Sequence, residues 1–580
     1  MTKTATKRTP ITLIADETQK LLDWTDSVQQ SDDTIFHKAK TLATRLGAHY
    51  RADGLTEIGF WAPELGADMF QPKNIYLEVL TPLNKIDPTL PNQKAKVHRE
   101  HLQLEKQGEY FWGVVSGMRP GTKDQMGSFY WLKYLDLQNE IQTIGDVLAY
   151  SLPYGVYAPA ELYDLNQLQE KRSDLEYFGQ GDRDESGIIR VHPPRNILQI
   201  HITTAAKEGT LAGLTRIYQR IAEKINANDA LTPAEQCYIG YDAVQLLPIE
   251  PTVEYRIEHD LGQGFFIFNE DDLDEIDPET EQVDYETEDI KITLKKPDIQ
   301  NWGYDIVIFG SSATNPSVLE TLRPDELVEF ISTLHTFPTG PIQVIFDIVY
   351  GHADNQALDV LNGRFLKGPN MRGLYDAIEE TNYDLEEVAS LCQRYLGAES
   401  EKEEVKQEAT KRKSAAQLQK LNVPEKSQVL TELDVGKLKV FARAFMEDMH
   451  QACNVWNYED YLVPELAAFN LTLRRFRHDH PWLHHNLSGL DRFNRISEDN
   501  YTLFYGLRSQ PTEEGASETP YQMAMVSHMG GDPITVTLGD WLQLDWDEWQ
   551  IAIASPGLEV SDLRSFELRD TQALLLERVS

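Results

Sequence analysis

The chain has 580 residues, of which 41% are hydrophobic and 25% are charged, a composition that indicates a globular protein with several domains. Its 93 Asp and Glu residues outnumber its 54 Lys and Arg residues, which gives a formal net charge of -39. Because like charges repel, such an acidic surface argues against nucleic acid and anionic membranes as partners.

The cysteines and the apolar runs bear on the compartment. Cys237, Cys392 and Cys453 are scattered, with neither disulfide nor metal-ligand spacing, which favours a reducing compartment. The basic N-terminus is not followed by an apolar core of signal-peptide length. No run approaches the roughly 18 apolar residues of a membrane span. We therefore expect a cytoplasmic protein, and we expect no cofactor.

The first part of the chain changes from a helical to a strand pattern. Residues 1–54 are predicted to form an N-terminal helical region. Over residues 55–165, short aromatic and β-branched runs between turn residues predict an antiparallel β-sandwich. Aromatic side chains exposed on such a sandwich could stack on a sugar, but in most proteins such residues belong to the core.

Three segments predict parallel strands, at residues 196–202, 241–251 and 342–346. Amphipathic helices are expected after the first of them and, from Pro324, before the third. The apolar run 342–346 predicts a strand that is buried on both faces. The acidic run 269–289 is interpreted as a solvated insertion; the alternative is a calcium-binding loop, although the run lacks the periodicity of an EF-hand.

The third strand is followed at once by Asp347, Tyr350 and His352. In parallel α/β sheets and barrels, the C-terminal ends of the strands carry the chemistry. The segment after residue 346 is therefore the first candidate for a functional site.

Three phrases around this strand carry a resemblance. Asp-Ile-Val-Tyr-Gly-His at 347–352 resembles the Asp-Val-Val-Tyr-Asn-His signature of the α-amylase superfamily of glycoside hydrolases. Trp-Gly-Tyr-Asp at 302–305 resembles that superfamily's Gly-Tyr-Asp turn, and residues 315–322 resemble the segment that leads into its third helix. The resemblance implies that residues 190–373 form the first part of a (β/α)8 barrel.

The resemblance also implies roles for three residues in binding a glucoside. Tyr304 would stack under the glucose ring, Asp347 would support that subsite, and His352 would hydrogen-bond a sugar hydroxyl. The alternative is that these residues are structural and bind no ligand. The superfamily's Asn, which often ligates calcium, is replaced here by Gly351, so we expect no metal at that position.

In the second half of the chain, the sequence resembles the superfamily only towards the C-terminus. An eight-stranded barrel takes about 250 residues, but residues 374–497 predict helices and no further group of buried strands. Within them, residues 464–483 resemble the superfamily's last barrel helix. Hairpin-spaced runs in residues 498–580 predict a C-terminal β-sandwich. The predicted fold is thus multidomain α/β plus β, with two β-sandwiches flanking an incomplete TIM-type barrel.

The reactive carboxylates of the superfamily are not found. Retaining glycosidases need two carboxylates about 5 Å apart, and in α-amylase relatives the nucleophilic Asp lies in a Gly-x-Arg-x-Asp phrase. The sequence contains no such phrase and no strand-ending Glu in the expected context. Glu250 lies near a strand end, but its context does not mark it as a nucleophile or an acid. We therefore assign no catalytic residue.

The phrases at 146–155, 246–252 and 350–352 look most like those of bacterial glucosylglycerol hydrolases. This resemblance implies an O-glycosyl hydrolase of the α-glucosidase type that acts on a small α-glucoside such as glucosylglycerol. Because its nucleophile and acid are not found, we expect this chain to be inactive or impaired. One alternative is a non-catalytic remnant that binds a sugar or a protein. Another is a sequence artefact in which the middle of a real hydrolase has been lost.

Overall fold

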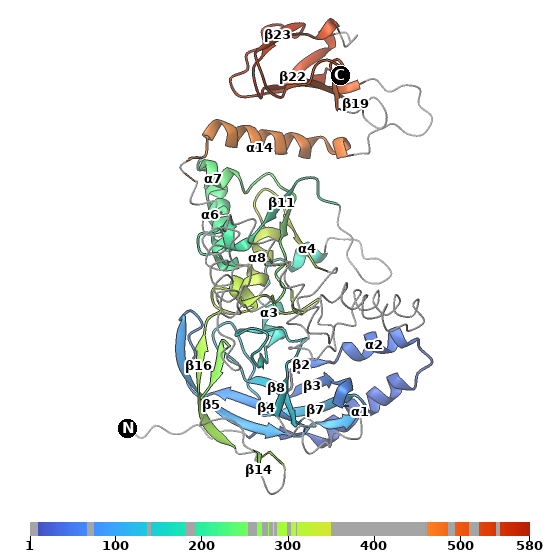
Figure 1. Cartoon of the computed structure of the whole chain (residues 1–580), viewed down its shortest axis with the longest axis vertical. Coiled ribbons are helices and arrows are strands. Elements are labelled where there is room, and N and C mark those ends of the chain that lie inside the picture. The colour runs from blue at the N-terminus through green and yellow to red at the C-terminus, as the bar shows by residue number, and fades with distance from the viewer. Residues whose placement is uncertain are drawn as a thin grey trace, which may run out of the picture.

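The structure of the protein, a computed structural model, places an N-terminal β-sandwich, a layer with a parallel sheet, helix α14 and a C-terminal β-sandwich one after another along its longest axis (Figure 1). The predicted helices between 374 and 458 and the candidate residue His352 fall outside the described residues. The structure describes residues 10–65, 75–135, 141–170, 172–179, 193–252, 264–269, 276–277, 282–283, 287–297, 303–304, 306–308, 310–349, 459, 461–484, 493–509, 521–540 and 546–579.

One sheet of the N-terminal sandwich is antiparallel and lies under the first helix. Its strands are β1 (Thr12–Leu13), β2 (Gly47–Tyr50), β3 (Thr56–Trp61), β6 (Glu105–Gln107) and β7 (Tyr110–Ser116). Helices α1 (Ala15–Gln29) and α2 (Ile35–Ala43) precede β2. Helix α1 packs Leu21 against Trp112 of β7, and the Thr18 hydroxyl accepts a hydrogen bond from the Val114 amide at 2.9 Å. The helical region predicted for residues 1–54 thus contains α1 and α2, together with β1 and β2, which pair into this sheet.

The other sheet of the sandwich takes strands from two distant parts of the chain. Its strands are β4 (Ile75–Pro82), β5 (Asn92–Leu102), β8 (Phe129–Leu135), β9 (Ile141–Ile144), β10 (Ala160–Glu161), β13 (Phe266–Phe268) and β16 (Glu288–Lys295). Strand β16 pairs with β5 along its whole length, from Glu288 opposite Arg99 to Lys295 opposite Asn92. A separate hairpin consists of β14 (Ile276–Asp277) and β15 (Gln282–Val283).

The end of the acidic run 269–289 is consequently not a solvated insertion. Asp289 lies 2.7 Å from the His98 ring of β5, and Glu288 pairs with Arg99. Side chains alternate between the two faces of β16, and the apolar ones on one face, such as Ile290 and Ile292, are 1% exposed. Opposite charges across the ladder and the buried face together fix the register of this strand.

The aromatic residues that suggested a sugar-binding sandwich are mostly in the core. Trp112 and Phe129 are fully buried, and Phe111 and Tyr130 are 1% exposed. Rings of the two sheets meet in the interior, where Phe60 and Tyr130 lie edge to face with centroids 6.4 Å apart. These rings stabilise the sandwich by apolar burial and present no face to a ligand.

A short parallel sheet forms the middle of the molecule (Figure 1). In the described residues it has the order β11 (Ile197–Ile200), β12 (Ala243–Leu246) and β17 (Gln343–Phe346), all parallel. Helices α6 (Leu211–Ala227) and α8 (Asp325–His335) pack against each other beside it. The ring centroids of Tyr218 in α6 and Phe330 in α8 are 6.1 Å apart. We call these three strands and two helices the half-barrel.

The sequence of α6 explains its bounds and its buried face. Thr210 caps its start by accepting a hydrogen bond from the Gly213 amide at 3.2 Å. Asn228 ends it in the left-handed conformation, with φ of 56°. Residues at helical spacing, including Leu214, Ile217 and Ile221, are buried against the sheet.

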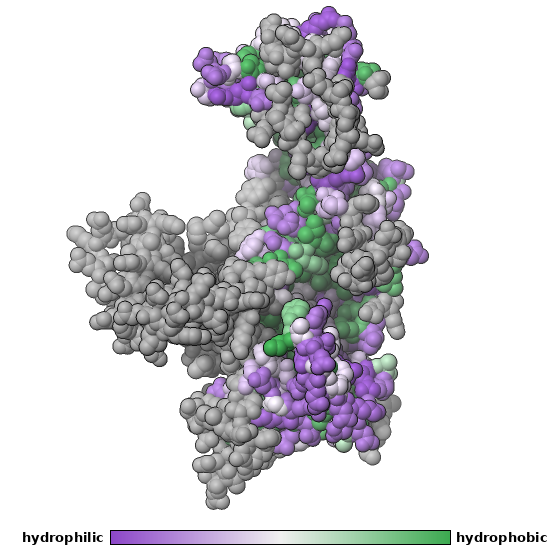
Figure 2. Space-filling model, turned by 90° about the vertical axis from the view of Figure 1, so that its right-hand side faces the viewer, coloured by the Kyte–Doolittle hydropathy of each residue, from purple (hydrophilic) through white to green (hydrophobic). Residues whose placement is uncertain are grey.

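Strand β17 is less buried than its apolar sequence predicts. Ile342 is 3% exposed, but Phe346 is 40% exposed and Val344 is half-buried. Among the described residues β17 pairs with β12 alone, and its end at Phe346 is exposed. Figure 2 shows hydrophobic surface in the middle of one side of the molecule, at the height of the half-barrel. The prediction of burial on both faces is therefore wrong for this strand.

Buried ionic groups join the half-barrel to the sandwich. Arg323, just before α8, is 2% exposed and binds both carboxylate oxygens of Glu161 in β10, at 2.7 and 2.6 Å. Nearby, the Tyr163 hydroxyl donates to Asp325. The connecting segments contain the short helices α3 (Leu165–Glu170), α4 (Leu175–Gly179), α5 (Ile202–Ala205) and α7 (Pro233–Gln236).

Helix α14 (Pro464–Asp479) packs on the half-barrel, where its Arg474 donates to the carbonyl oxygens of Ile239 at 2.9 Å and Gln236 at 2.7 Å. Beyond it lies the C-terminal sandwich, whose two sheets share one apolar core. One sheet contains β18 (Phe493–Arg495), β19 (Leu503–Ser509), β20 (Tyr521–His528), β22 (Trp549–Ala554) and β24 (Ala573–Arg578). The other contains β21 (Ile534–Thr537) and β23 (Ser565–Leu568).

In the parts of the chain that the structure describes, no helix combines the length and the apolar character that crossing a membrane requires.

Candidate functional site

Two of the three candidate residues meet at the carboxyl edge of the half-barrel, the edge at which β11, β12 and β17 end. Asp347 follows β17 directly, and its amide continues the ladder to the Leu246 carbonyl at 3.0 Å. The Tyr304 hydroxyl donates a hydrogen bond of 2.9 Å to Asp347 Oδ2. Residues 43 positions apart are thus brought together, whereas the third candidate, His352, lies outside the described residues.

Gly303 fixes the place of Tyr304. Its φ is +85°, and a Cβ atom there would lie 2.2 Å from the Pro248 carbonyl oxygen. That distance is far inside van der Waals contact, so only glycine allows this backbone to lie against the loop after β12. The close approach positions the neighbouring tyrosine ring, which is 40% exposed.

The protonation of Tyr304 suits its role as a donor. Partial desolvation raises the pKa of Tyr304, and the hydrogen bond to Asp347 and the charge of Asp347 raise it further. The phenol therefore keeps its proton at neutral pH and leaves the second oxygen of Asp347 available as an acceptor. The pair offers a flat apolar ring beside an anionic oxygen.

Glu250 is a further carboxyl group at the same edge. It follows β12 in the loop and is 6% exposed. Burial raises the pKa of Glu250, while the backbone amides of Gly310, Val349 and Ser311 oppose that shift. Because Val349 is two residues from Asp347, Glu250 connects the loop after β17 with the loop at 310–311.

The raised pKa gives Glu250 one property of a proton donor. However, its Oε2 atom is buried and has no hydrogen-bond partner, so the group is sealed from a ligand as it stands. Sequence reasoning noted Glu250 without giving it a role. The signal that could have distinguished it is a carboxylate between the apolar Ile249 and Pro251 at a strand exit.

Hydrogen bonds link the loops around Glu250. The Asn315 amide donates to the Ile249 carbonyl at 2.7 Å, and the Asn315 side chain donates to the Thr252 hydroxyl at 3.1 Å. Between His201, Pro248 and Gly303 lies a pocket of about 10 Å³, which has room for about one water molecule. The pocket in this described part of the edge is therefore far too small to enclose a sugar.

No group of three or more His, Cys, Asp or Glu side chains that could hold a metal ion occurs in the portion of the chain that the structure describes. The position of Gly351, where calcium was not expected, lies outside that portion.

Similar solved structures are distant. A pullulanase from Paenibacillus barengoltzii, in complex with maltohexaose and α-cyclodextrin, is 12% identical, with a TM-score of 0.45 over 92% of this chain and 95% of that chain. A mutant of that pullulanase with maltotetraose is 13% identical, with a TM-score of 0.44 over 96% and 97% of the two chains.

A candidate α-amylase from Salmonella typhimurium is 16% identical, with a TM-score of 0.29; the match covers 55% of this chain and 35% of that one. The chain thus spans about a third of the length of that relative. TM-scores of this size carry no argument about function, and no curated protein matches the chain.

A family match, in contrast, covers nearly the whole chain. It extends over residues 20–374 and 372–576, and the family is described as hypothetical glycoside hydrolase 5, GHL5. The two matched stretches overlap at residues 372–374, where the predicted first part of the barrel ends. On this evidence, the chain belongs to the glycoside hydrolase family that is described as hypothetical glycoside hydrolase 5.

Proposed function

We propose that the chain keeps the glucose subsite of a glycoside hydrolase and binds a small α-glucoside of the glucosylglycerol kind without hydrolysing it. The observation that carries this proposal is the hydrogen bond of 2.9 Å between Tyr304 and Asp347 at the carboxyl edge of the half-barrel. In the proposal, His352 completes the subsite.

The chemistry of the pair suits a sugar. A pyranose presents an apolar face of C–H groups, which packs on an aromatic ring, and a rim of hydroxyls that need acceptors. The Tyr304 ring is 40% exposed, and the Asp347 carboxylate has an oxygen beyond the one that Tyr304 uses. A small number of well-placed polar groups beside an apolar surface is typical of ligand sites.

The absence of hydrolysis follows from the sequence. The chain contains no Gly-x-Arg-x-Asp phrase, and the superfamily's nucleophile and acid come from barrel strands that are not recognised here. The break in the family match at residues 372–374 supports a loss of sequence at this point. Removal of the groups that act together in catalysis eliminates most of the rate enhancement.

Purified protein incubated with glucosylglycerol is therefore expected to release no glucose above a boiled control. A coupled glucose assay over several hours measures this. Turnover that scales with protein concentration would show that reactive carboxylates are present and would contradict this part of the proposal.

Calorimetric titration with glucosylglycerol is expected to give saturable binding that depends on Tyr304. Tyr304→Ala removes the stacking face and should weaken binding roughly tenfold or more. Tyr304→Phe keeps the ring but loses the hydrogen bond to Asp347, so it should weaken binding only a few-fold.

Tyr501→Ala is the matched control, because Tyr501 is 73% exposed and lies in the C-terminal part of the chain. This variant should bind like the unmodified protein. The subsite would be ruled out if the Tyr304→Ala variant bound glucosylglycerol as tightly as the unmodified protein does. It would also be ruled out if glucosylglycerol, trehalose and maltose gave no saturable heat. In that case a non-catalytic remnant that binds a protein and a sequence artefact are the remaining interpretations of the family relationship.

A sequence artefact makes a different prediction at the level of the gene. Resequencing the locus between the codons for Arg372 and Gly373 would then reveal intervening barrel sequence. The two-part family match that meets at 372–374 makes this the natural place to look. An uninterrupted junction supports a natural deletion.

A further inference from the structure

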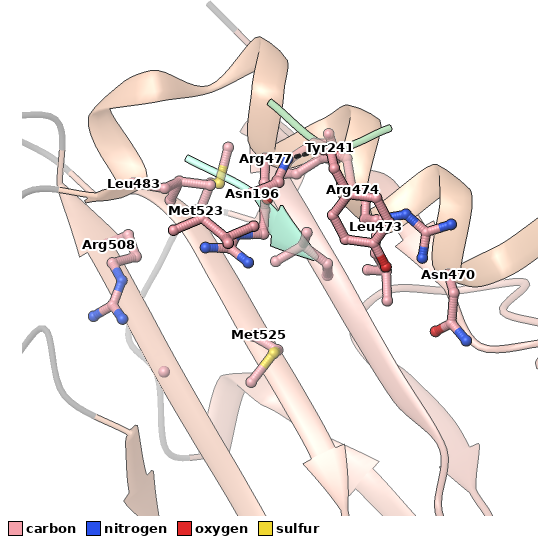
Figure 3. Close-up of a pocket in the computed structure, with 14 residues that line it drawn as sticks. Asn196, Tyr241, Asn470, Leu473, Arg474, Arg477, Leu483, Arg508, Met523 and Met525 are labelled. Atoms are coloured by element: carbon pink, nitrogen blue, oxygen red, sulfur yellow. Dashed lines mark hydrogen bonds between the residues drawn. The ribbon is translucent and has the colours of Figure 1, made fainter. Parts of the chain in front are cut away.

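A second hollow lies at the opposite, amino edge of the half-barrel. A cavity of about 520 Å³ separates the start of β11 and helix α14 from the C-terminal sheet (Figure 3). Asn196 precedes β11, and Tyr241 precedes β12, so both lie at the ends of the strands remote from Tyr304 and Asp347. The volume falls within the range of roughly 300–1,000 Å³ that is typical of small-molecule sites.

Two walls of the cavity are apolar and accessible. Leu473 and Phe476 line it from α14, and Met525 of β20 and Leu575 of β24 line it from the C-terminal sheet. All four side chains are only half-buried, so each keeps apolar surface that a ligand entering the cavity would cover. Covering such surface is favourable in proportion to its area, and a methionine side chain adapts to the shape of what it contacts.

The charged groups that line the cavity are all positive. Arg474 and Arg477 come from α14, and Arg508 comes from β19 of the facing sheet. No Asp or Glu side chain of the described residues lines the same space, although the whole chain has a formal net charge of -39. A cleft that gathers charges of one sign attracts ligands of the other sign, so the cavity favours an anion.

Arg477 is the arginine best placed to hold an anionic group. It is exposed and donates one hydrogen bond, of 3.2 Å, to the Arg195 carbonyl. A guanidinium carries five N–H donors, so most of its donors stay available. In the close-up, the Arg477 side chain lies between α14 and the C-terminal sheet (Figure 3).

Arg474 is held more firmly and has a structural role. It donates to the carbonyl oxygens of Ile239 and Gln236, and its guanidinium lies 4.7 Å from the centre of the Tyr241 ring. Carbonyl oxygens and an aromatic ring leave the positive charge of the guanidinium uncompensated. Arg474 therefore adds to the positive potential of the cavity without having to bind the ligand directly.

The carboxylate of Asp242, the residue after Tyr241, does not compensate these charges. Its Oδ2 atom accepts the backbone amides of Arg195 and Asn196 at 2.9 Å each, and its Oδ1 atom lies 3.6 Å from the His478 ring. Among the described residues it forms no ion pair with an arginine of the cavity. Its hydrogen bonds are instead used to hold the chain at the start of β11.

We propose that this cavity binds a small amphipathic anion, a molecule with an apolar body and one acidic group such as a carboxylate or a sulfonate. The apolar body covers the leucine, phenylalanine and methionine walls, and the acidic group accepts hydrogen bonds from Arg477 at the exposed side of the cavity. The site is separate from the glucoside subsite and does not depend on it. A glucoside is not its ligand, because most sugar hydroxyls would lose their hydrogen bonds against the apolar walls.

Two fluorescent probes that differ by one acidic group test the choice of ligand. They are 8-anilinonaphthalene-1-sulfonate and N-phenyl-1-naphthylamine, which has the same rings without the sulfonate. The fluorescence of the sulfonate probe should rise saturably on titration with the full-length protein at pH 7. The sulfonate probe should bind roughly fivefold or more tightly than the neutral probe, because an ion pair at an accessible site contributes up to about 1 kcal/mol.

A matched pair of arginine substitutions tests the role of Arg477. Arg477→Gln should remove most of the advantage of the sulfonate probe and leave the affinity of the neutral probe unchanged. Arg475→Gln makes the same change of net charge at an exposed neighbour on α14 that does not line the cavity. This control should keep the ratio of the two affinities that the unmodified protein has.

A pair of tryptophan substitutions tests the location. Met525→Trp fills the cavity and should weaken binding of both probes at least roughly tenfold. Met529→Trp adds the same side chain at a position that is 62% exposed, just after β20, and should leave binding unchanged. Leu473→Trp, which fills the cavity from α14, replaces Met525→Trp if that variant does not fold as judged by circular dichroism.

Several outcomes would overturn the proposal: no saturable binding, equal affinities of the two probes, an equal effect of the two arginine substitutions, or full binding by the variants with a filled cavity. Displacement of the sulfonate probe by glucosylglycerol would also overturn it, by making the cavity a sugar site. Because the probe assay does not use Tyr304 or Asp347, its result is independent of whether the glucoside subsite exists.

Discussion

Glu161→Ala is expected to lower the free energy of unfolding by about 3–5 kcal/mol, because it leaves a buried guanidinium without its partner. The Glu161 carboxylate binds Arg323 through both oxygens, and it also accepts from the Gly127 amide and the Ser151 hydroxyl at 2.7 Å each. Arg323 is 2% exposed, so water cannot replace the lost carboxylate. Arg323 lies just before α8 of the half-barrel, and Glu161 lies in the sandwich. The loss of their ion pair should therefore let the two parts separate more easily.

The chain contains its own control for this prediction. Lys123 of the sandwich and Glu329 of α8 form an ion pair between the same two parts, but each side chain is 48% exposed. Glu329→Ala should therefore lower the free energy of unfolding by less than about 1 kcal/mol. Urea unfolding and scanning calorimetry compare the variants, with the shift of the transition midpoint as the readout because a chain of several domains need not unfold in two states. Equal midpoints for the two variants would show that the buried pair does not stabilise the junction.

Acid is expected to destabilise the N-terminal sandwich through Glu78. This residue of β4 is fully buried and accepts hydrogen bonds from Trp131, from Lys133 at 2.9 Å and from His101 at 3.3 Å. Burial by itself raises the pKa of Glu78, but the charge of Lys133 and the interactions with His101 outweigh burial and lower the pKa to about 2 from 4.5.

The sign of the effect follows from this lowered pKa. The unfolded chain binds a proton at Glu78 near pH 4.5 and the folded chain only near pH 2, so the contribution to stability is complete above pH 4.5 and is lost as the pH falls towards 2. The loss amounts to about 3 kcal/mol at most. Urea midpoints at a series of pH values measure it.

Glu78→Gln should lower the stability at pH 7 and flatten the profile between pH 4.5 and 2. Glu105→Gln, in the same domain at an exposed position of β6, should keep the slope of the unmodified protein. If the profile of Glu78→Gln retains that slope, other carboxylates cause the acid sensitivity and this account of Glu78 is wrong.

The sequence by itself determined the local elements. Helical spacing and caps placed α6 and α8, and the resemblance placed α14; apolar runs placed the three parallel strands, and alternation placed most strands of the C-terminal sandwich. Each of these signals is contained in a window of a few residues, because side-chain periodicity and capping act over one or two turns. The Tyr304 and Asp347 candidates came instead from a resemblance in short phrases, and the structure supplied the contact between them.

Only the tertiary structure decided the pairings between distant segments. Strand β16 joins β5 although His98 and Asp289 are 191 positions apart, and Arg323 binds Glu161 across 162 positions. No local sequence pattern predicts which distant residues will pair, since periodicity shows which face of an element is apolar but not which element covers that face. The same reason explains the exposed Phe346 and the buried Glu250: burial depends on neighbours that other parts of the chain provide.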